Sequence, residues 1–215
     1  MKKIIEQGVQ DLDRAISGFP TTDKIAYGWW LKQTYHYVCH STRLLALASS
    51  RFSRDPQQDA LHYRFSEHVA EERGHEFLAS RDLKALGFDL NEFEELPETQ
   101  AFYQSQYYWI EHVHPIAFFG YVLCLEAFSL SGGVRMYKDA LPAFGEKATL
   151  FMKVHVQEDV GHLDKALQLV ENLPADQREI VLSNFRLSCA LYERIYHAIQ
   201  ARISSTSSKI RLKAA

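Results

Sequence analysis

Two segments of the chain share the pattern His-Val-x-Glu-acid-x-Gly-His. The copies are His68–His75 and His155–His162. On a helix, the two histidines and the second acid of each copy stand at i, i+4 and i+7, which places three potential ligands on one face. Imidazole nitrogen with carboxylate oxygen suits iron, manganese or zinc, whereas a structural zinc site would normally use thiolates. Two such copies predict one metal site, most simply for iron, built from more than one helix.

Each copy also contains an acid-x-x-His pair, which helical bundles use to build di-iron sites. A further carboxylate, Glu126, stands alone in the most apolar segment of the chain. A buried ionised carboxylate is tolerated only when it is paired, hydrogen-bonded or bound to a metal, so we expect Glu126 to be a bridging or terminal ligand. The predicted metal ligands are Glu72, His75, Glu126, His155, Asp159 and His162.

Three further histidines, His36, His40 and His68, are open candidates. His36 and His40 share one face of a predicted helix, where they could bind the metal or only line its pocket. His68 lies a full helical turn before Glu72. The remaining histidines are interpreted as structural or surface residues, and the aromatic segment 102–121 as core. The histidines set aside in this way are His62, His112, His114 and His197.

Apolar residues at helical spacing predict helices over most of the chain, and no segment has the alternation of a strand. Prolines and glycines set the expected ends of these helices. The expected ranges are 4–16, 22–50, 55–86, a kinked segment ending at 114–115, 116–130, 142–172 and 174–203. The sequence therefore predicts a single all-α domain of about seven or eight helices over 1–203, followed by a flexible tail over 204–215.

The composition excludes several classes of protein. The chain has 215 residues, is 47% hydrophobic and carries a formal net charge of -3, so it lacks the basic excess expected for binding nucleic acid or an anionic membrane. Its three cysteines, Cys39, Cys124 and Cys189, form no CxxC pair. No uninterrupted apolar run is long enough for a signal peptide or a membrane span. We expect a cytoplasmic protein that acts on a small molecule.

These residues resemble the heme-oxygenase-like helical fold of thiaminase II, the pyrroloquinoline-quinone synthase and the Chlamydia protein associating with death domains. The resemblance covers roughly Thr22 to Glu171. The iron-containing redox branch of that fold, the heme-oxygenase-like di-iron oxidases, carries an acid and a His on one helix, a Glu on a later helix, and then His-x3-Asp-x2-His. Glu72 with His75, Glu126, and His155 with Asp159 and His162 match that pattern.

The resemblance implies an enzyme that uses iron and O2 to oxidise a small amine, amino acid or fatty acid. It also implies one or two iron ions per chain and a homodimer. Many members of the branch have a further Glu ligand on the second helix, where this chain has Gln33, His36 and His40. One of the two iron sites is therefore expected to be altered.

Three other readings stay open. Ser131-Gly132-Gly133 resembles the glycine-containing helix of heme oxygenase, which would make the protein heme-binding with His36 as the axial ligand. A thiaminase-II-like hydrolase would need a cysteine nucleophile, for which Cys39 and Cys124 are the nominees. The same scaffold could also be a metal-binding module without catalysis, because a fold does not fix a function.

Overall fold

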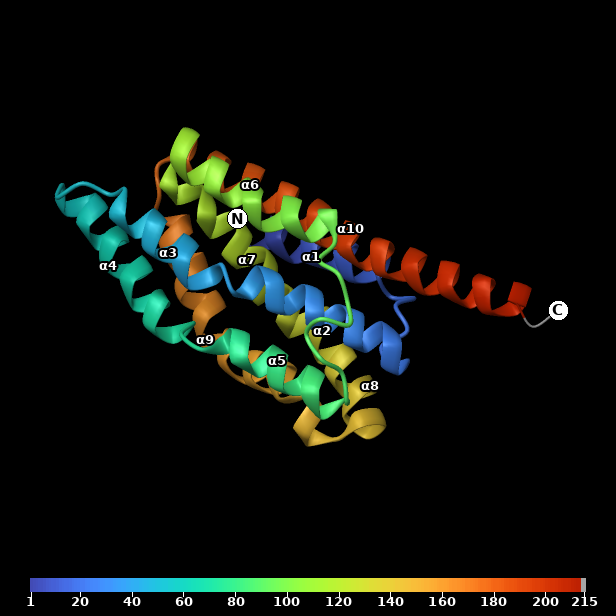
Figure 1. The fold of residues 1–215 in the computed structure, drawn as a ribbon. Coiled ribbons are helices and arrows are strands. Elements are labelled where there is room, and N and C mark those ends of the chain that lie inside the picture. Colours follow the sequence, from blue (N-terminus) through green and yellow to red (C-terminus); the bar gives the residue numbers. More distant parts are fainter. Residues whose placement is uncertain (214–215) are drawn as a thin grey trace.

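The chain folds into a bundle of helices (Figure 1). The structure, a computed structural model, describes the backbone of residues 1–213, and their side chains except those of 57, 158–160, 162 and 206–213. Within 1–213 there is no β-strand. The predicted all-α class is confirmed.

The helices follow one another with short connections. Short 3-10 helices cover Pro115–Ala117 and Glu146–Ala148, and a π-helical turn covers Ser129–Gly133. The α-helices are α1 (Lys2–Ala15), α2 (Lys24–Val38), α3 (Ser41–Ser50), α4 (Pro56–Glu71), α5 (His75–Ala85), α6 (Pro97–His112), α7 (Phe118–Phe128), α8 (Val134–Phe144), α9 (Leu150–Glu171) and α10 (Ala175–Lys213).

The apolar helix α7 lies inside the bundle, where α1, α9 and α10 pack against it (Figure 1). Gly120 allows α10 to come close to α7. A Cβ atom at this position would lie 2.4 Å from the carbonyl oxygen of Val181 and 2.5 Å from the backbone nitrogen of Phe185. Only glycine fits such a backbone approach. The close packing leaves Glu126, two residues before the end of α7, only 5% exposed.

The helix predicted over 55–86 is wrong at one point, because the chain breaks between α4 and α5. α4 ends at Glu71, and α5 begins at His75. Gly74 has φ +95°, a left-handed conformation that favours glycine and ends the helical path. Glu72 therefore lies in a corner between two helices, and the first copy of the motif is not one continuous helix face.

Three other predicted boundaries need correction. The helix expected over 22–50 is divided at Cys39 and His40, although Asp23 caps its start as expected, with its Oδ1 accepting a hydrogen bond from the backbone of Ala26 at 2.8 Å. Pro142 lies inside α8, not at the start of α9. Helix α10 continues to Lys213, past the predicted end near 203.

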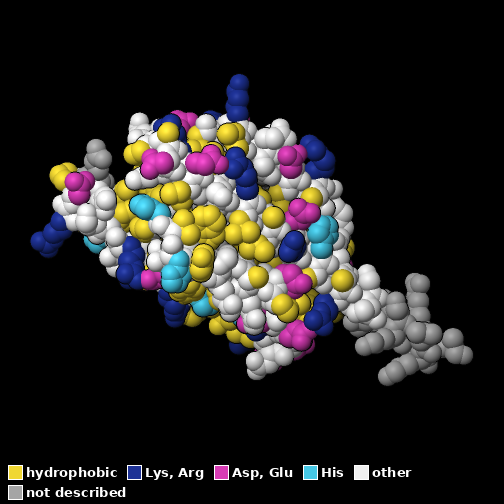
Figure 2. Space-filling view, turned by 90° about the horizontal axis from the view of Figure 1, so that it is seen from above, with side chains coloured by type: hydrophobic (Ala, Val, Ile, Leu, Met, Phe, Trp, Pro, Cys, Tyr) yellow, Lys and Arg dark blue, Asp and Glu magenta, His cyan; other side chains and the backbone are white. Residues whose placement is uncertain are grey.

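One continuous helical stretch, Pro115–Phe144, is long and apolar enough to cross a membrane, contrary to the expectation from sequence. Of its most apolar window, however, 78% is buried inside the structure, as befits a core helix of this composition. Figure 2 shows acidic and basic side chains intermixed on the face it presents, with neither sign gathered into a patch.

Candidate metal centre

Glu72, His75 and His155 meet where α4, α5 and α9 converge. Each offers one ligand atom, and these atoms lie within 4.8 Å of one another. Bonds from a first-row metal ion to imidazole or carboxylate are about 2.0–2.2 Å long, so ligands of one ion lie at most about 4.4 Å apart. The three side chains thus need only a small adjustment to bind one ion. The donor types suit iron, manganese or zinc, and after that adjustment their spacing suits one such ion.

A hydrogen bond fixes the proton of His155. Its Nδ1 lies 2.8 Å from the carbonyl oxygen of Phe151, one turn earlier on α9. Because a carbonyl oxygen only accepts hydrogen bonds, Nδ1 must carry a proton, which leaves Nε2 as the ring atom available to a metal. Metal-binding histidines are commonly held in this way by a backbone carbonyl or a carboxylate. The ring of His155 also contacts the ring of His75, with centroids 4.8 Å apart.

His68 and Glu126 extend the cluster toward α7. His68 Nε2 lies 3.3 Å from Glu126 Oε1 and 3.5 Å from Glu72 Oε1. His75 Nδ1 lies 3.2 Å from Glu72 Oε2. Two imidazoles therefore flank the Glu72 carboxylate, and His68 joins it to Glu126. The structure thus places Glu126 beside the predicted ligands, together with His68, whose role the sequence left open.

The Glu72 carboxylate is held in its ionised form. Burial opposes ionisation, but hydrogen bonds from His68 and His75 and the charges of His68 and His155 outweigh it, so the pKa of Glu72 falls well below its usual range. Its neighbour Glu71 turns away instead, toward Arg64 at 3.1 Å and Lys165 at 3.6 Å. The two adjacent acids thus have different roles: Glu71 forms ion pairs, and Glu72 is the carboxylate of the candidate centre.

Asp82 ties α5 to the start of α9. Its Oδ2 accepts a hydrogen bond from the backbone N–H of Phe151 at 2.8 Å, at a helix start where Thr149 provides no side-chain cap. Burial raises the pKa of Asp82 to about 7, and hydrogen bonds from the backbones of Phe151 and Leu150 offset part of that rise. Because α5 begins with His75 and α9 carries His155, this contact fixes the separation of two candidate ligands.

A cavity of ≈ 90 Å³ adjoins the centre. A buried water needs about 10–15 Å³ of such space, so the cavity has room for a small organic group. His68, Glu72, Glu126 and His155 form part of its wall. The other lining residues are Trp30, Tyr37, Val38, Ser41, Leu45, Phe118, Tyr121, Val122, Leu125, Phe128, Ser129, Gly133, Phe151, Met152, Val156 and Tyr192.

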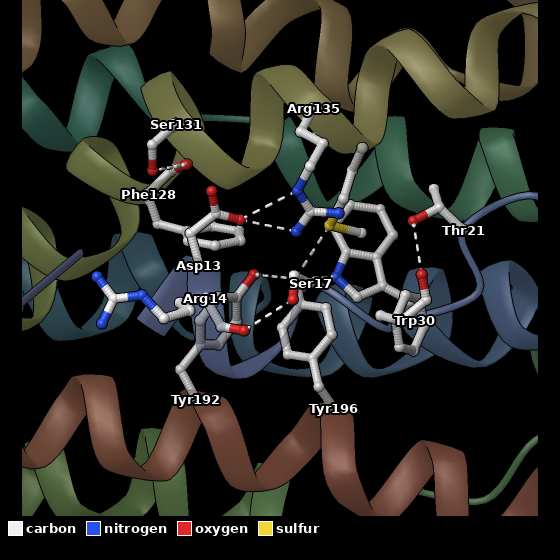
Figure 3. Close-up of polar contacts among 12 residues, drawn as sticks. Asp13, Arg14, Ser17, Thr21, Trp30, Phe128, Ser131, Arg135, Tyr192 and Tyr196 are labelled. Carbon is white, nitrogen blue, oxygen red and sulfur yellow. Dashed lines mark hydrogen bonds and ion pairs between the residues drawn. The ribbon is translucent and has the colours of Figure 1, made fainter. Parts of the chain in front are cut away.

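Hydrogen bonds fix the aromatic side chains on one part of this wall (Figure 3). The indole N–H of Trp30 donates to the Tyr196 hydroxyl at 2.8 Å, and that hydroxyl lies 3.2 Å from the hydroxyl of Tyr192. Nearby, Arg135 donates two hydrogen bonds to Asp13 at 2.7 and 3.1 Å, which ties α8 to α1 (Figure 3). These hydrogen bonds hold the side chains of Trp30 and Tyr192 in place on this part of the wall.

The structure does not bring His36 and His40 to the centre. His36 Nδ1 faces Glu95 Oε1 at 3.7 Å. His40 stacks on Tyr103 with ring centroids 3.9 Å apart, and its Nδ1 lies 2.8 Å from the Tyr107 hydroxyl. Neither histidine lines the cavity. This position does not suit His36 as an axial ligand for a heme in that cavity.

Two predicted ligands, Asp159 and His162, have side chains outside the described residues. Their helix, α9, also carries His155, and the backbone of the second motif is helical throughout. The second copy of the motif thus stays on one helix, unlike the first.

The cysteines do not form a nucleophilic site with the cavity. Cys124 is buried with its Sγ 3.4 Å from that of Cys189, and Cys39 lies at the break between α2 and α3. Burial raises the pKa of both Cys39 and Cys124, which favours the unreactive thiol. Neither lines the cavity. The thiaminase-like reading thus gains no support.

The fold is that of the heme-oxygenase-like proteins. A domain with this fold from Shewanella denitrificans superposes with a TM-score of 0.85 at 20% identity, covering 96% of this chain and 94% of that one. A TenA homologue from Pseudomonas syringae gives 0.76 at 12% identity, with 93% and 92% covered. A CADD-like protein from Nostoc punctiforme gives 0.64 at 13% identity, with 94% and 96% covered. At these identities the likeness establishes the fold.

The family follows from the sequence itself. The model of the family described as "Iron-containing redox enzyme" matches residues 28–193, which span every element that contributes to the centre. The chain belongs to this family. No curated protein matches the sequence.

Proposed function

We propose that this protein is a non-heme iron enzyme that uses O2 to oxidise a small organic substrate. The carrying observation is that Glu72, His75 and His155 place one ligand atom each within 4.8 Å of the others, beside a largely apolar cavity. Membership of the iron-containing redox enzyme family supports iron as the metal. Dioxygen, the number of ions and the reaction are part of the proposal.

In this proposal Glu72, His75 and His155 hold one iron ion, with His68 and Glu126 next to it. Asp159 and His162 stay sequence-based candidates for a second ion. Bound iron would supply the redox chemistry with O2 that amino-acid side chains lack. The protein's own groups perform the remaining work: Phe151 fixes the ring of His155, Glu72 supplies a permanent negative charge, and the apolar walls exclude water.

A metal-binding module without catalysis would differ from an oxidase in the space that lies beside the metal. A storage or structural site needs no room beside the metal, whereas an oxidase needs space for its substrate. The cavity of ≈ 90 Å³ shares His68, Glu72, Glu126 and His155 with the candidate centre. This shared wall favours the enzyme.

The test is reactivity with oxygen. The protein is loaded with ferrous iron under anaerobic conditions and then mixed with O2, while the visible spectrum and O2 consumption are followed. We expect faster O2 consumption than by the same free ferrous iron, a new visible band, and the loss of both in His155→Ala. His197→Ala is the matched control, because His197 is exposed and contacts only Glu193 in the part of the chain described. If iron binds but reacts with O2 no faster than free iron does, the proposed enzyme activity is overturned and the metal-binding module without catalysis is favoured.

A further inference from the structure

Two free cysteines from different helices touch through their sulfur atoms. Sγ of Cys189 lies 3.4 Å from Sγ of Cys124, although 65 positions separate them in the sequence. Neither residue lines the cavity, and neither is a candidate ligand, so the proposed iron chemistry gives the pair no role. The sulfur–sulfur bond of a disulfide is about 2.05 Å long, so these atoms need to approach by about 1.4 Å to form one.

The packing of α7 on α10 brings the backbones of the two cysteines together. A disulfide requires Cα atoms about 4.4–6.8 Å apart, so helices that it joins must pack closely. Gly120 provides such packing, because a Cβ atom there would lie 2.5 Å from the backbone nitrogen of Phe185. Cys124 follows Gly120 by one helical turn, and Cys189 follows Phe185 by one turn. The two thiols therefore meet beside a close approach of the helices.

The two thiols differ in their access to solvent. Cys124 is 0% exposed, and burial raises its pKa well above the usual value, with the contact to Cys189 adding to the rise. Cys189 is partly exposed and lies on α10 between the exposed residues Arg186 and Ala190. An oxidant that arrives from solvent therefore reaches Cys189 first, and Cys124 is the second thiol, held beside it.

We propose that Cys124 and Cys189 form a reversible disulfide when the protein is exposed to hydrogen peroxide. The sulfur of Cys189 attacks one peroxide oxygen, the O–O bond breaks, and the thiol proton leaves with the other oxygen as water. The sulfenic acid formed on Cys189 is then attacked by the sulfur of Cys124. Its hydroxyl leaves with the Cys124 proton as a second water. The two thiols together lose two electrons and two protons, which reduce the peroxide to water.

The position of Cys124 decides the fate of the oxidised Cys189. A sulfenic acid without a neighbouring thiol is oxidised further, to the irreversible sulfinic acid, whereas one beside a thiol condenses to a disulfide. The bond would join α10 to α7, the helix that carries Glu126, and would close a long loop of chain. Such a cross-link restricts the unfolded chain and so stabilises the folded protein. A thiol reductant reverses it by exchange.

The test uses the full-length, metal-free protein, reduced, freed of reductant and treated with a small excess of hydrogen peroxide in the presence of a chelator. Free thiols are alkylated and counted after unfolding, and linked peptides are identified by mass spectrometry. Wild type should fall from three thiols to one, with Cys124 linked to Cys189. Its melting temperature should rise by about 5–10 °C, and dithiothreitol should reverse both changes.

Cys39→Ala is the matched control, because Cys39 lies between α2 and α3, and this variant should form the same link. Cys189→Ser changes the partly exposed partner and should keep Cys124 as a free thiol under the same treatment. The proposal is overturned if wild type keeps three thiols, if Cys189 becomes a sulfinic acid without a link, or if Cys39 enters the disulfide equally. Because no metal is present, neither outcome bears on the proposed iron chemistry, and a failure to bind iron leaves this result standing.

Discussion

His68 Nε2 lies 3.3 Å from Glu126 Oε1, so a buried imidazole from α4 touches the carboxylate of the core helix α7. The same nitrogen lies 3.5 Å from Glu72. Two carboxylates thus share one imidazole in a region with almost no access to water. A cation bound among them would offset the same negative charge, so metal binding and the stability of this region must be linked.

Ferrous iron should therefore raise the melting temperature of the protein, and Glu126→Gln should reduce that rise. A ligand that binds only the folded state stabilises it by about 2.7 kcal/mol at a concentration of 100 times its Kd. Thermal melts with and without ferrous iron, under anaerobic conditions, measure the difference. Glu171→Gln is the control, because Glu171 is exposed at the far end of α9. An equal rise in Glu126→Gln and wild type would remove Glu126 from the centre.

The two motif glycines should respond oppositely to alanine. Gly74 has φ +95°, so Gly74→Ala forces a side chain into the left-handed region and should lower the free energy of unfolding by about 1–2 kcal/mol. Gly161 lies within α9, and a Cβ there meets no atom within 4 Å, so Gly161→Ala should raise it by about 0.5–1 kcal/mol. Urea unfolding of both variants measures this. A neutral Gly74→Ala would contradict the left-handed break between α4 and α5, and a destabilising Gly161→Ala would contradict the open helical position of Gly161 in α9.

Asp82 should make the metal-free protein less stable as the pH rises. Its pKa is about 7 in the folded protein, against an ordinary value of 3.8, so between these values the folded state holds more protons than the unfolded state. This group's contribution to the free energy of unfolding then falls with rising pH, by about 2–3 kcal/mol between about pH 5 and about pH 8. In Asp82→Asn, whose amide oxygen can still accept from Phe151, that part of the slope should disappear. Urea unfolding of both proteins across this pH range, in the presence of a chelator, measures the slope. The same slope in Asp82→Asn and wild type would contradict a raised pKa of Asp82 in the folded protein.

Tyrosine hydroxyls with and without partners should differ in their effect on stability. Tyr192→Phe removes a hydroxyl that lies within hydrogen-bonding distance of Tyr37 and Tyr196, and should lower the free energy of unfolding by about 1–2 kcal/mol. Tyr121→Phe removes a hydroxyl without a partner in the described part of the chain, and should leave stability unchanged or raised. Chemical denaturation of the ligand-free proteins compares them. Equal losses would show that the two hydroxyls are alike.

The sequence predicted the all-α class and three side chains that the structure places close together, because both follow from local pattern. The caps, prolines and apolar spacing indicated helices, and the motif indicated Glu72, His75 and His155, which the structure brings together. Glu126 was singled out as a lone carboxylate in an apolar segment, and it lies beside His68. Each of these signals came from residue types and their spacing within one short segment of the chain.

What the sequence could not give depends on tertiary packing. A glycine in a helical pattern does not by itself predict a left-handed conformation. Gly74 and Gly161 occupy the same place in the two motif copies, yet Gly161 is helical and Gly74 is left-handed. The ion pairs of Glu71 with Arg64 and Lys165 also depend on packing, because α9 brings Lys165 to Glu71. Asp82 lies far from Phe151 in sequence, so its cap of α9 carried no local signal.

The most direct test of the centre is its iron stoichiometry. Protein is equilibrated with ferrous iron under anaerobic conditions, freed of loosely bound metal and assayed for iron per chain, in wild type, in Glu72→Gln with His155→Ala, and in the control Glu71→Gln. We expect about one or more ions per chain in wild type and in Glu71→Gln, and a loss of at least about tenfold in affinity in the double variant. Uptake well below about one ion per chain in wild type, or equal uptake by the double variant, would contradict an iron centre at Glu72, His75 and His155.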